Sequence, residues 1–511
     1  MKLSELTAVL CLIWALTLLY GEMLAFRLPS LATCGWPHHS QSLNNNYLKV
    51  AVLTDPQLTD RTSLRLPPKS LSLELVQFYS DLYMRRAFLS SVLPFDPDVI
   101  LFLGDHFDGG PYLSDLEWKE SLSRLKHVFP VSKQETPVYW IAGNHDIGYE
   151  YLHTRAPQAI TRYEKEFGSL NYRFRVGQVE FIAIDAQAID GNPQGYMASS
   201  TRAFVKNVSL DIQAYPRVLL THIPLYRQDK TDCGPNRKSE IVNQRIVRSP
   251  DRREIAYQNY ITEESSKYLL DSIQPVLVLS GHDHDQCDVV HKSKYGPVKE
   301  HTVGTISWQQ GNVYPSFMLL SACNTSSSEK PVLTQLCFLP VQLHIYIWYL
   351  SLFVLTVLAL LLWPAGGVSF WHNFSDLLVC GKQLISSITS RPKEKDEDLN
   401  CEYEMMWDAE GAMHLVKKAS NVSVTNKSEK ISVERGTTVI RPTAKKNISQ
   451  ELEVSVNADV FDSMAKTLPR ASKSWTKLVI QRLVRTFRMV TIIAAVNVPI
   501  YMLLLFKDWI D

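Results

Sequence analysis

The sequence predicts an α/β domain that is attached to a membrane by apolar helices. Short apolar segments alternate with amphipathic ones between residues 48 and 322, and three other stretches are long and apolar enough to span a bilayer. The chain has 511 residues, so about two or three structural units are expected. The 53 basic and 52 acidic residues nearly cancel, and we therefore expect no nucleic acid among its partners.

The first apolar stretch is "LTAVLCLIWALTLLYGEMLAF", which runs from Leu6 to Phe26. Its short positive start suits either a cleaved signal peptide or an uncleaved signal anchor. The motif "LPSLA" is compatible with signal-peptide cleavage, but the apolar run continues past Glu22, which favours an uncleaved anchor. We therefore expect residues 1–26 to form an uncleaved N-terminal anchor helix.

Two further stretches are predicted to cross the membrane. "LHIYIWYLSLFVLTVLALLLW", residues 343–363, contains no charged side chain and has Tyr and Trp near its ends. "MVTIIAAVNVPIYMLLLF", residues 489–506, contains Asn497 and Pro499, which a membrane helix tolerates where neighbouring groups satisfy its backbone.

Basic residues predict the orientation of these helices. "RPKEKDEDLN" follows the second stretch and several Lys and Arg residues precede the third, so residues 364–488 are expected in the cytosol. Most of this segment is charged or polar without periodicity, which favours a partly disordered loop. Residues 27–342 are then lumenal, and residues 507–511 form a short lumenal tail.

Cysteines and glycosylation sequons give a test of this topology. The lumenal segment has five cysteines, so at most two disulfides can form, and their spacing does not predict the pairing. No C-x-x-C occurs, which argues against a cysteine zinc site. Asn207 and Asn324 lie in lumenal sequons and are expected to carry glycans. The sequons on the cytosolic side should stay unmodified; they are at Asn373, Asn421, Asn426 and Asn447.

Six lumenal segments are predicted to be buried strands, because each is short, rich in Val, Ile and Leu, and ends in a turn residue or His. They are "LKVAVLT", "PDVILFLGD", "PVYWIAGN", "VEFIAIDA", "RVLLTHIP" and "QPVLVLSGH". Residues 72–93 have the periodicity of an amphipathic helix, and "SFMLLSA" adds a further strand near the C-terminal edge. Such an order implies a sheet that is covered by helices.

Residues that can bind metals recur where these strands end. They are Asp55 and Gln57, Asp105 and Asp108, Asn144, His145 and Asp146, His222, and His282 and His284. His106 and Asp285 are better explained as structural residues. Two nearby cations repel each other, so such a site needs one bridging carboxylate, and imidazole, amide and carboxylate ligands suit Mn, Fe or Zn better than Ca. The sequence therefore predicts a dinuclear metal site that binds phosphate.

The order of these motifs resembles that of the calcineurin-like metallophosphoesterases over residues 50–322. The resemblance implies a four-layer α/β/β/α sandwich in which Asp105 bridges the two metals. Asp55 and His284 would complete the first metal shell, and Asn144, His222 and His282 the second. It further implies that His145 acts as general acid or charge stabiliser near the leaving-group oxygen and is held by Asp146, and that Asp108 orients a ligand.

Gln57 departs from this pattern, because the family usually has a His that binds the first metal there. An amide oxygen is a weaker and harder donor than imidazole. We therefore expect Mn as the most plausible metal, with Fe, Zn and Mg as alternatives.

Other features resemble a membrane-bound branch of this family in the secretory pathway, which includes the phosphoesterase that removes ethanolamine phosphate from glycosylphosphatidylinositol (GPI) anchors. They are the N-terminal anchor, "GNHDIGY", "HIPLYR" and "TISWQQGNVYPSFMLLS". The resemblance implies a lumenal active site in the endoplasmic reticulum or early Golgi and a lipid-linked phosphoglycan substrate. Arg227 and Trp308 are the expected substrate contacts, although Trp308 equally suits a packing role.

Two alternatives remain open at this stage. The same metal ligands would serve a phosphoesterase acting on another lipid headgroup or a nucleotide, because the metals contact only the phosphate. Gln57 and the polar cytosolic loop also fit a cargo adaptor that binds phosphoglycans without turnover.

Overall fold

The computed structural model describes residues 2–37, 47–131, 136–242, 245–251, 254–324, 331–364, 403–407, 413–417 and 475–510. The chain divides into two compact units, Met1–Gly367 with Ile480–Asp511, and Val368–Val479. In the second unit the described residues form an antiparallel pair, β14 (Tyr403–Trp407) and β15 (Met413–Lys417). Most of the predicted cytosolic loop, and its four sequons, lie outside the described residues.

The first unit contains a five-stranded mixed sheet in the order β13-β12-β1-β2-β3. These strands are β1 (Tyr47–Leu53), β2 (Val99–Phe102), β3 (Val138–Trp140), β12 (Ser316–Cys323) and β13 (Val332–Phe338). β1 runs parallel to β2 and antiparallel to β12. The predicted segment "SFMLLSA" is therefore an interior strand, and the unpredicted β13 forms the edge.

A second mixed sheet has the order β10-β11-β9-β6-β5-β4. Its strands are β4 (Tyr172–Val176), β5 (Val179–Ala183), β6 (Arg217–Leu220), β9 (Pro275–Ser280), β10 (Cys287–Ser293) and β11 (Gly296–Thr302). The central strands are parallel and each outer strand is antiparallel to its neighbour. A separate short pair is formed by β7 (Ile246–Arg248) and β8 (Ile255–Gln258).

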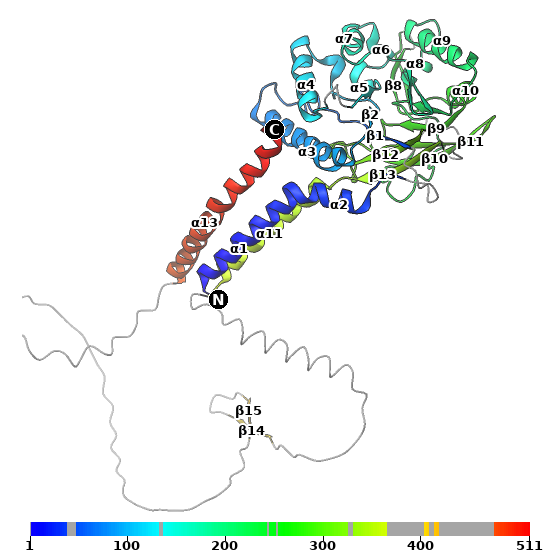
Figure 1. The fold of residues 1–511 in the computed structure, drawn as a ribbon. Coiled ribbons are helices and arrows are strands. Elements are labelled where there is room, and N and C mark those ends of the chain that lie inside the picture. The colour runs from blue at the N-terminus through cyan, green and yellow to red at the C-terminus, as the bar shows by residue number, and fades with distance from the viewer. Residues whose placement is uncertain are drawn as a thin grey trace, which may run out of the picture. The chain divides into compact units, whose positions relative to one another are not determined.

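The two sheets pack face to face and helices cover their outer faces (Figure 1). Val52, Leu101, Val218 and Leu279 belong to the buried core between the sheets. The helices over the first sheet are α3 (Leu71–Ala87) and α4 (Asp115–Val128), and those over the second are α9 (Tyr196–Leu210) and α10 (Glu263–Ile273). The predicted α/β/β/α sandwich is confirmed.

Local sequence determines where these helices begin. Ser70 caps α3 by accepting a hydrogen bond from Leu73 N, and Ser114 and Glu117 form a capping box at α4. The helix predicted over residues 72–93 is α3 followed by a π-helical turn, Phe88–Val92. Four short helices lie near the strand ends: α5 (Asn144–Ile147), α6 (Glu150–His153), α7 (Gln158–Phe167) and α8 (Ala186–Ile189).

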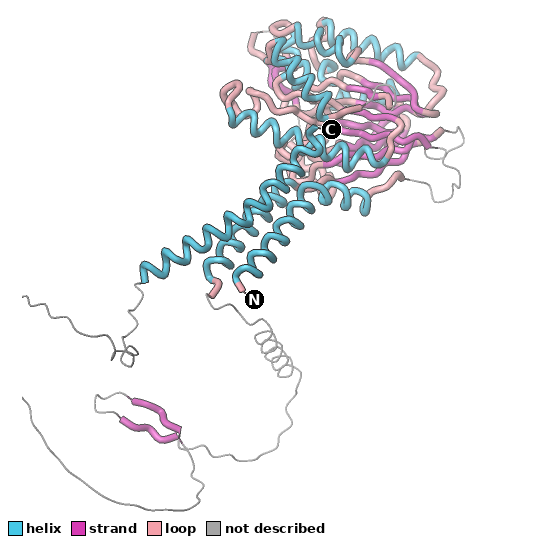
Figure 2. Tube along the Cα trace, turned by 60° about the vertical axis from the view of Figure 1, so that its left-hand side comes forward, coloured by secondary structure: helices cyan, strands magenta, loops and turns pink. Residues whose placement is uncertain are grey.

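Three helices are long and apolar enough to cross a membrane (Figure 2). The first combines α1 (Leu3–Leu19), a π-helical turn (Tyr20–Leu24) and α2 (Ala25–Thr33). The others are α11 (Gln342–Leu362) and α13 (Trp475–Ile510). The first and third extend beyond the predicted spans, because a helix continues past the part of it that is apolar.

A buried charged cluster joins these helices to α3. Arg86 of α3 forms ion pairs with Glu22 of the first membrane helix and with Asp508 near the end of α13, the latter at 3.0 Å. The hydroxyl of Tyr349, on α11, donates to Glu22 Oε1 at 2.8 Å. The Arg86 and Glu22 side chains are only 4% and 2% exposed, so each charge depends on the other for compensation.

Two disulfides form within the segment predicted to be lumenal, which is the largest number its five cysteines allow. Cys34, at the end of α2, pairs with Cys337 of β13, and Cys233 pairs with Cys287 at the start of β10. The two sequons expected to carry glycans, at Asn207 and Asn324, are both exposed.

Candidate metal centre

The predicted metal-binding residues lie at one edge of the two sheets, just beyond the carboxyl ends of parallel strands. Asp55 and Gln57 follow β1, Asp105 follows β2, Asn144 follows β3, His222 follows β6, and His282 and His284 follow β9. This edge is where α/β sheets carry their functional groups.

Two sets of possible metal ligands form at this edge, and Asp105 belongs to both. One set is Asp105, His222 and His282, and the other is Asp55, Asp105 and His284; within each set the ligand atoms lie within 4.8 Å of one another. His222 Nε2 is 3.2 Å from Asp105 Oδ2 and 3.2 Å from Asn144 Oδ1. This donor chemistry fits two divalent cations that share one carboxylate.

The backbone at these ligands adopts an uncommon conformation. Five of them have positive φ angles: Asp55 (48°), Gln57 (40°), Asp105 (52°), His282 (69°) and His284 (57°). Left-handed backbone costs about 1–2 kcal/mol for residues with a Cβ, so surrounding contacts must hold these loops. Gly143 allows one close approach, because a Cβ there would lie 2.1 Å from Asp105 Oδ1.

Hydrogen bonds orient His222 toward the centre of the site. Its Nδ1 contacts the carbonyl oxygen of Leu103 at 2.8 Å, which leaves Nε2 facing Asn144 and Asp105. Burial lowers the pKa of His222, but the Asp105 charge outweighs burial and raises this pKa to about 9. In Asp105, burial is outweighed by His222 and His145, so the pKa of this carboxyl lies well below its usual range.

Gln57 occupies the position at which the family usually has a His. Its Nε2 donates to Asp105 Oδ2 at 3.0 Å, and its backbone N–H donates to the Asp105 carbonyl at 2.9 Å. Rotation of the amide about its last torsion would present Oε1 instead. The side chain therefore lies at the site, next to the carboxylate that the two ligand sets share.

The structure corrects the role predicted for Asp146. This carboxylate does not hold His145; it accepts from the backbone N–H groups of His106, Phe107 and Gly143 and contacts His106 Nδ1 at 2.8 Å. Asp146 is buried and points back toward the loop after β2, which it joins to the loop after β3. His106, expected to be structural, is its buried partner.

Asp108 holds His145 instead. The Nδ1 atom of His145 contacts the Asp108 carbonyl oxygen and lies 3.4 Å from Asp108 Oδ1, while His145 N donates to Asp105 Oδ1 at 2.8 Å. Burial lowers the pKa of His145, but Asp105 and Asp108 outweigh burial and raise this pKa to about 10. The side chain is 37% exposed, so a protonated imidazole is accessible beside the ligands.

The two expected substrate contacts are structural in this fold. Arg227 has a fully buried side chain, which forms ion pairs with Asp283 at 3.1 Å and Glu300 at 3.5 Å, so its charge is already compensated. Trp308 packs edge-to-face against Tyr346 of α11, with ring centroids 5.8 Å apart. Of the two roles considered for Trp308, packing is the one that the structure shows.

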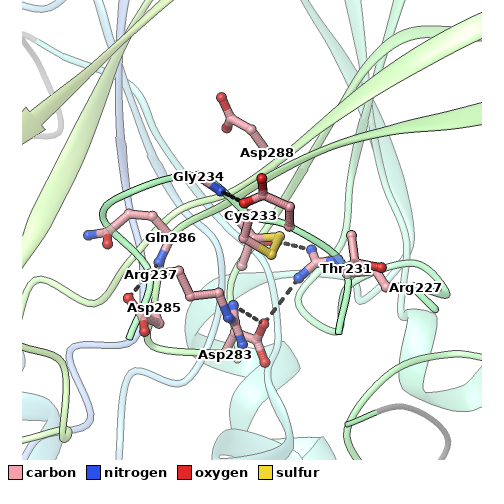
Figure 3. The surroundings of a disulfide bond; sticks show 12 residues. Arg227, Thr231, Cys233, Gly234, Arg237, Asp283, Asp285, Gln286 and Asp288 are labelled. Carbon is pink, nitrogen blue, oxygen red and sulfur yellow. Dashed lines mark hydrogen bonds and ion pairs between the residues drawn. A yellow bond between two sulfur atoms is a disulfide. The ribbon is translucent and has the colours of Figure 1, made fainter. Parts of the chain in front are cut away.

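Sequence reasoning missed a set of contacts that holds the loop between β9 and β10. Asp283, between the two histidines of this loop, accepts hydrogen bonds from Arg227, Arg237 and the Tyr260 hydroxyl, and Figure 3 shows both guanidinium groups directed at it. The pattern "GHDHD" contained the signal, because its aspartates alternate with the proposed ligands.

The neighbouring Asp285 and Cys287 attach this loop to residues 231–239. Asp285 Oδ2 accepts from the backbone N–H groups of Lys238 and Ser239 and from the Ser239 hydroxyl. The Cys233–Cys287 disulfide adds a covalent link (Figure 3). These contacts therefore hold the loop that carries the positive φ angles of His282 and His284.

Comparisons with known proteins agree with this geometry. The family model for calcineurin-like phosphoesterases matches residues 48–286. Cell division control protein 1 of Saccharomyces cerevisiae is 28% identical over 361 residues, which cover 66% of this chain and 68% of the yeast protein. Metallophosphoesterase 1 of Pongo abelii is 29% identical over 399 residues, 71% of this chain and 92% of that protein. Metallophosphoesterase 1 of Danio rerio is 29% identical over 290 residues, 52% of this chain and 71% of that protein.

The matched region contains all the residues in the two ligand sets. Residues 48–286 therefore form a calcineurin-like phosphoesterase domain, and this family consists of metal-dependent phosphoester hydrolases.

Proposed function

We propose that this protein is a membrane-anchored phosphodiesterase that removes ethanolamine phosphate from the glycan of GPI anchors. Its catalytic domain faces the lumen of the endoplasmic reticulum or early Golgi, where the reaction remodels GPI-anchored proteins for transport. Support comes from the similarity to metallophosphoesterase 1, from the three apolar helices, and from the motifs shared with the GPI-processing branch of the family.

The position of Asp105 carries the chemical part of this proposal. Because Asp105 belongs to both ligand sets, its carboxylate would be shared by two cations. Asp55, Gln57 and His284 would complete one shell, and Asn144, His222 and His282 the other. Two divalent cations held there, Mn first and Fe, Zn or Mg as alternatives, supply the positive charge that activates a phosphodiester toward water.

The protein side chains then position the substrate and move one proton. Asp105 and Asp108 raise the pKa of His145 to about 10, and its Nδ1 contacts the Asp108 carbonyl oxygen, so Nε2 is the atom that donates a proton to the departing ester oxygen. Asp108 keeps the imidazole in this orientation. Asp146 and Gly143 keep the loops after β2 and β3 close enough for His145 and Asp105 to act on one phosphate.

The test uses the full-length protein in lipid vesicles that contain a GPI bearing ethanolamine phosphate. Release of ethanolamine phosphate is followed by mass spectrometry while Mn, Fe, Zn and Mg are titrated. We expect Mn-dependent release that is lost in Asp105→Asn and retained in the matched control Asp115→Asn, an exposed carboxylate on α4. Hydrolysis of nucleotides alone would reject the GPI substrate, and binding without product under every metal would favour the adaptor.

A further inference from the structure

An apolar groove runs along the helices that are apolar enough to cross a membrane. It lies between the first of these helices and α11, and its volume is about 560 Å³. Apolar side chains form most of its walls, among them Leu16, Ala25, Pro29, Val341, Ile345 and Trp348. In Figure 1 α1 and α11 lie side by side, and α2 contacts β13 at the edge of the first sheet. The groove is therefore next to the phosphoesterase domain.

Local sequence in the first helix shapes this groove. The helix has a π-helical turn at Tyr20–Leu24 and contains Pro29, and both features bend helices. Gly21, within the π-helical turn, lets α11 approach closely, because a Cβ there would collide with the Tyr349 hydroxyl. The two helices are therefore in contact at Gly21, and the groove lies beside this contact.

The groove spans about one leaflet of a bilayer. Its lining extends from Val341 to Tyr349 on α11 and from Leu16 to Pro29 on the first helix, about 12 Å and about 20 Å along the helix axes. One leaflet contributes about 15 Å of hydrocarbon. Both stretches lie toward the phosphoesterase domain, because α11 follows β13 directly and α2 contacts that strand. We therefore expect the groove to face the acyl chains of the leaflet nearest to this domain.

One loop connects the groove to the proposed metal centre. The carbonyl oxygen of Gln310 contacts His284 Nδ1 at 3.1 Å. Trp308 packs against Tyr346 with ring centroids 5.8 Å apart, and Tyr346 directly follows Ile345 in the groove wall. Trp308 and Gln310 are separated by at most about 7 Å of chain. A proposed metal ligand and the groove are therefore within reach of one lipid-linked substrate.

We propose that this groove binds an acyl chain of the lipid that carries the phosphoglycan substrate. The proposal rests on the function proposed above and adds a site for the lipid part of that substrate. A chain bound there fixes the position of the lipid, so the glycan phosphate has less freedom to lose when it reaches the metal ligands. An acyl chain gains little by leaving other acyl chains, so close van der Waals contact with the groove walls must favour binding.

An acyl chain fits this groove better than a sugar or a second protein helix. Most of the lining is hydrocarbon, so a sugar would lose its hydrogen bonds to water there without replacing them. A packed helix would need a contact surface along much of α11. The lining instead stops at Tyr349, whereas α11 continues to Leu362.

The kinetic test compares intact GPI in phosphatidylcholine vesicles with the water-soluble glycan that remains after the lipid is removed. Both carry the same ethanolamine phosphate, and the full-length protein with Mn should have a kcat/KM about tenfold higher for the lipid-linked form. Ile345→Trp and Thr17→Trp, which fill the groove from its two walls, should each lower this ratio about tenfold. Ile347→Trp, the same change at an exposed position of α11 outside the groove, should leave the ratio unchanged.

Two further measurements separate the lipid site from folding and from turnover. Hydrolysis of bis(4-nitrophenyl) phosphate should be equal in all these proteins, because this substrate has no lipid. Phosphatidylinositol with a diazirine in one acyl chain, diluted into phosphatidylcholine vesicles, should label the groove walls saturably. Mass spectrometry of the labelled peptides should show that Ile345→Trp removes this labelling and that Ile347→Trp retains it.

The outcomes distinguish the groove from the proposed function. Labelling that does not saturate and is equal on the exposed face of α13, or a kinetic ratio that both groove variants leave unchanged, overturns the lipid site. Cross-links that join two copies of the chain through the groove walls would also overturn it, because they assign the groove to an oligomer. Saturable labelling without hydrolysis of either glycan would keep the lipid site and reject the GPI substrate.

Discussion

Gln57 Nε2 lies 3.0 Å from Asp105 Oδ2, the carboxylate that both sets of possible metal ligands share. The amide thus stands at the centre of the site rather than turning away from it. If the site no longer bound metal, the Gln57 side chain would not need to contact Asp105. The relationship favours Gln57 as a ligand whose chemistry sets the choice of metal.

Replacing this amide with imidazole tests that idea. Gln57→His should tighten Zn binding about 10- to 100-fold and lower the preference for Mn, because imidazole nitrogen is a softer and stronger donor than an amide oxygen. Metal content after dialysis against graded chelator measures the effect. Gln335→His, at an exposed position of β13, is the matched control, and equal Zn affinity in both variants would contradict the ligand role.

The pair formed by His145 and Asp108 predicts a pH effect. Asp108→Asn removes one of the two negative charges that raise the pKa of His145, so this pKa should fall. A general acid is active while protonated, and its activity is lost as the pH rises through its pKa. The alkaline limb of the kcat profile should therefore move to lower pH in Asp108→Asn.

His145→Ala provides the reference for this measurement. It should lower kcat by about 10²–10⁴ and remove the alkaline limb, while metal content stays unchanged. If the alkaline limb of the kcat profile moved to higher pH in Asp108→Asn, or persisted in His145→Ala, the general acid would be a group other than His145.

Much of the site could be predicted from sequence because its signal is local. Each metal-capable residue directly follows an apolar run, and parallel strands bring their carboxyl ends to one edge, so the grouping of Asp55, Asp105, His222 and His284 followed from the order of strands. The direction in which a side chain points, by contrast, depends on contacts with residues far away in the sequence. Asp146 neighbours His145 in sequence, yet its carboxylate points back toward the loop after β2.

Contacts between residues that are far apart in the sequence could not be predicted either. Arg227 was expected to contact substrate through its charge, but its partner Asp283 is 56 residues away, and the fold leaves their side chains only 0% and 11% exposed. β13 was missed because "VLTQLCF" mixes polar and apolar residues, as an edge strand does. Asp185 stands at the end of the predicted strand "VEFIAIDA", but only the register of β5 and β6 places it beside His222.

The contacts of Asp283 predict that this residue acts on the metal site from outside it. Asp283→Asn leaves Arg227 and Arg237, whose side chains are 0% and 6% exposed, with one fewer counter-charge. The loop should become more mobile, and the affinity of the site for its metal should fall about 10- to 100-fold. Asp288→Asn, at a 57% exposed carboxylate of β10, is the control, and similar metal retention in both would exclude this role.

The pair formed by Arg86 and Glu22 predicts a large loss of stability. Arg86→Met would leave the buried Glu22 and the partly buried Asp508 without a cation. Removing one partner of a buried pair costs about 3–5 kcal/mol, so the thermal unfolding midpoint in detergent should drop sharply. Adding Glu22→Gln should restore part of the loss. Lys267→Met, which breaks an exposed pair with Glu263, should have little effect, and equal effects of the two single variants would contradict the prediction.

The raised pKa of Asp185 predicts a pH effect on stability. Burial raises the pKa of this carboxyl from 3.8 to about 7, so between these values the unfolded chain ionises while the folded protein stays protonated. Stability present at low pH is therefore lost as the pH rises through about 7, by up to about 4 kcal/mol. Asp185→Asn lacks this loss, so its unfolding midpoint should rise relative to wild type between pH 5 and pH 8. A gap that does not change with pH would show that the pKa of Asp185 is not raised in the folded protein.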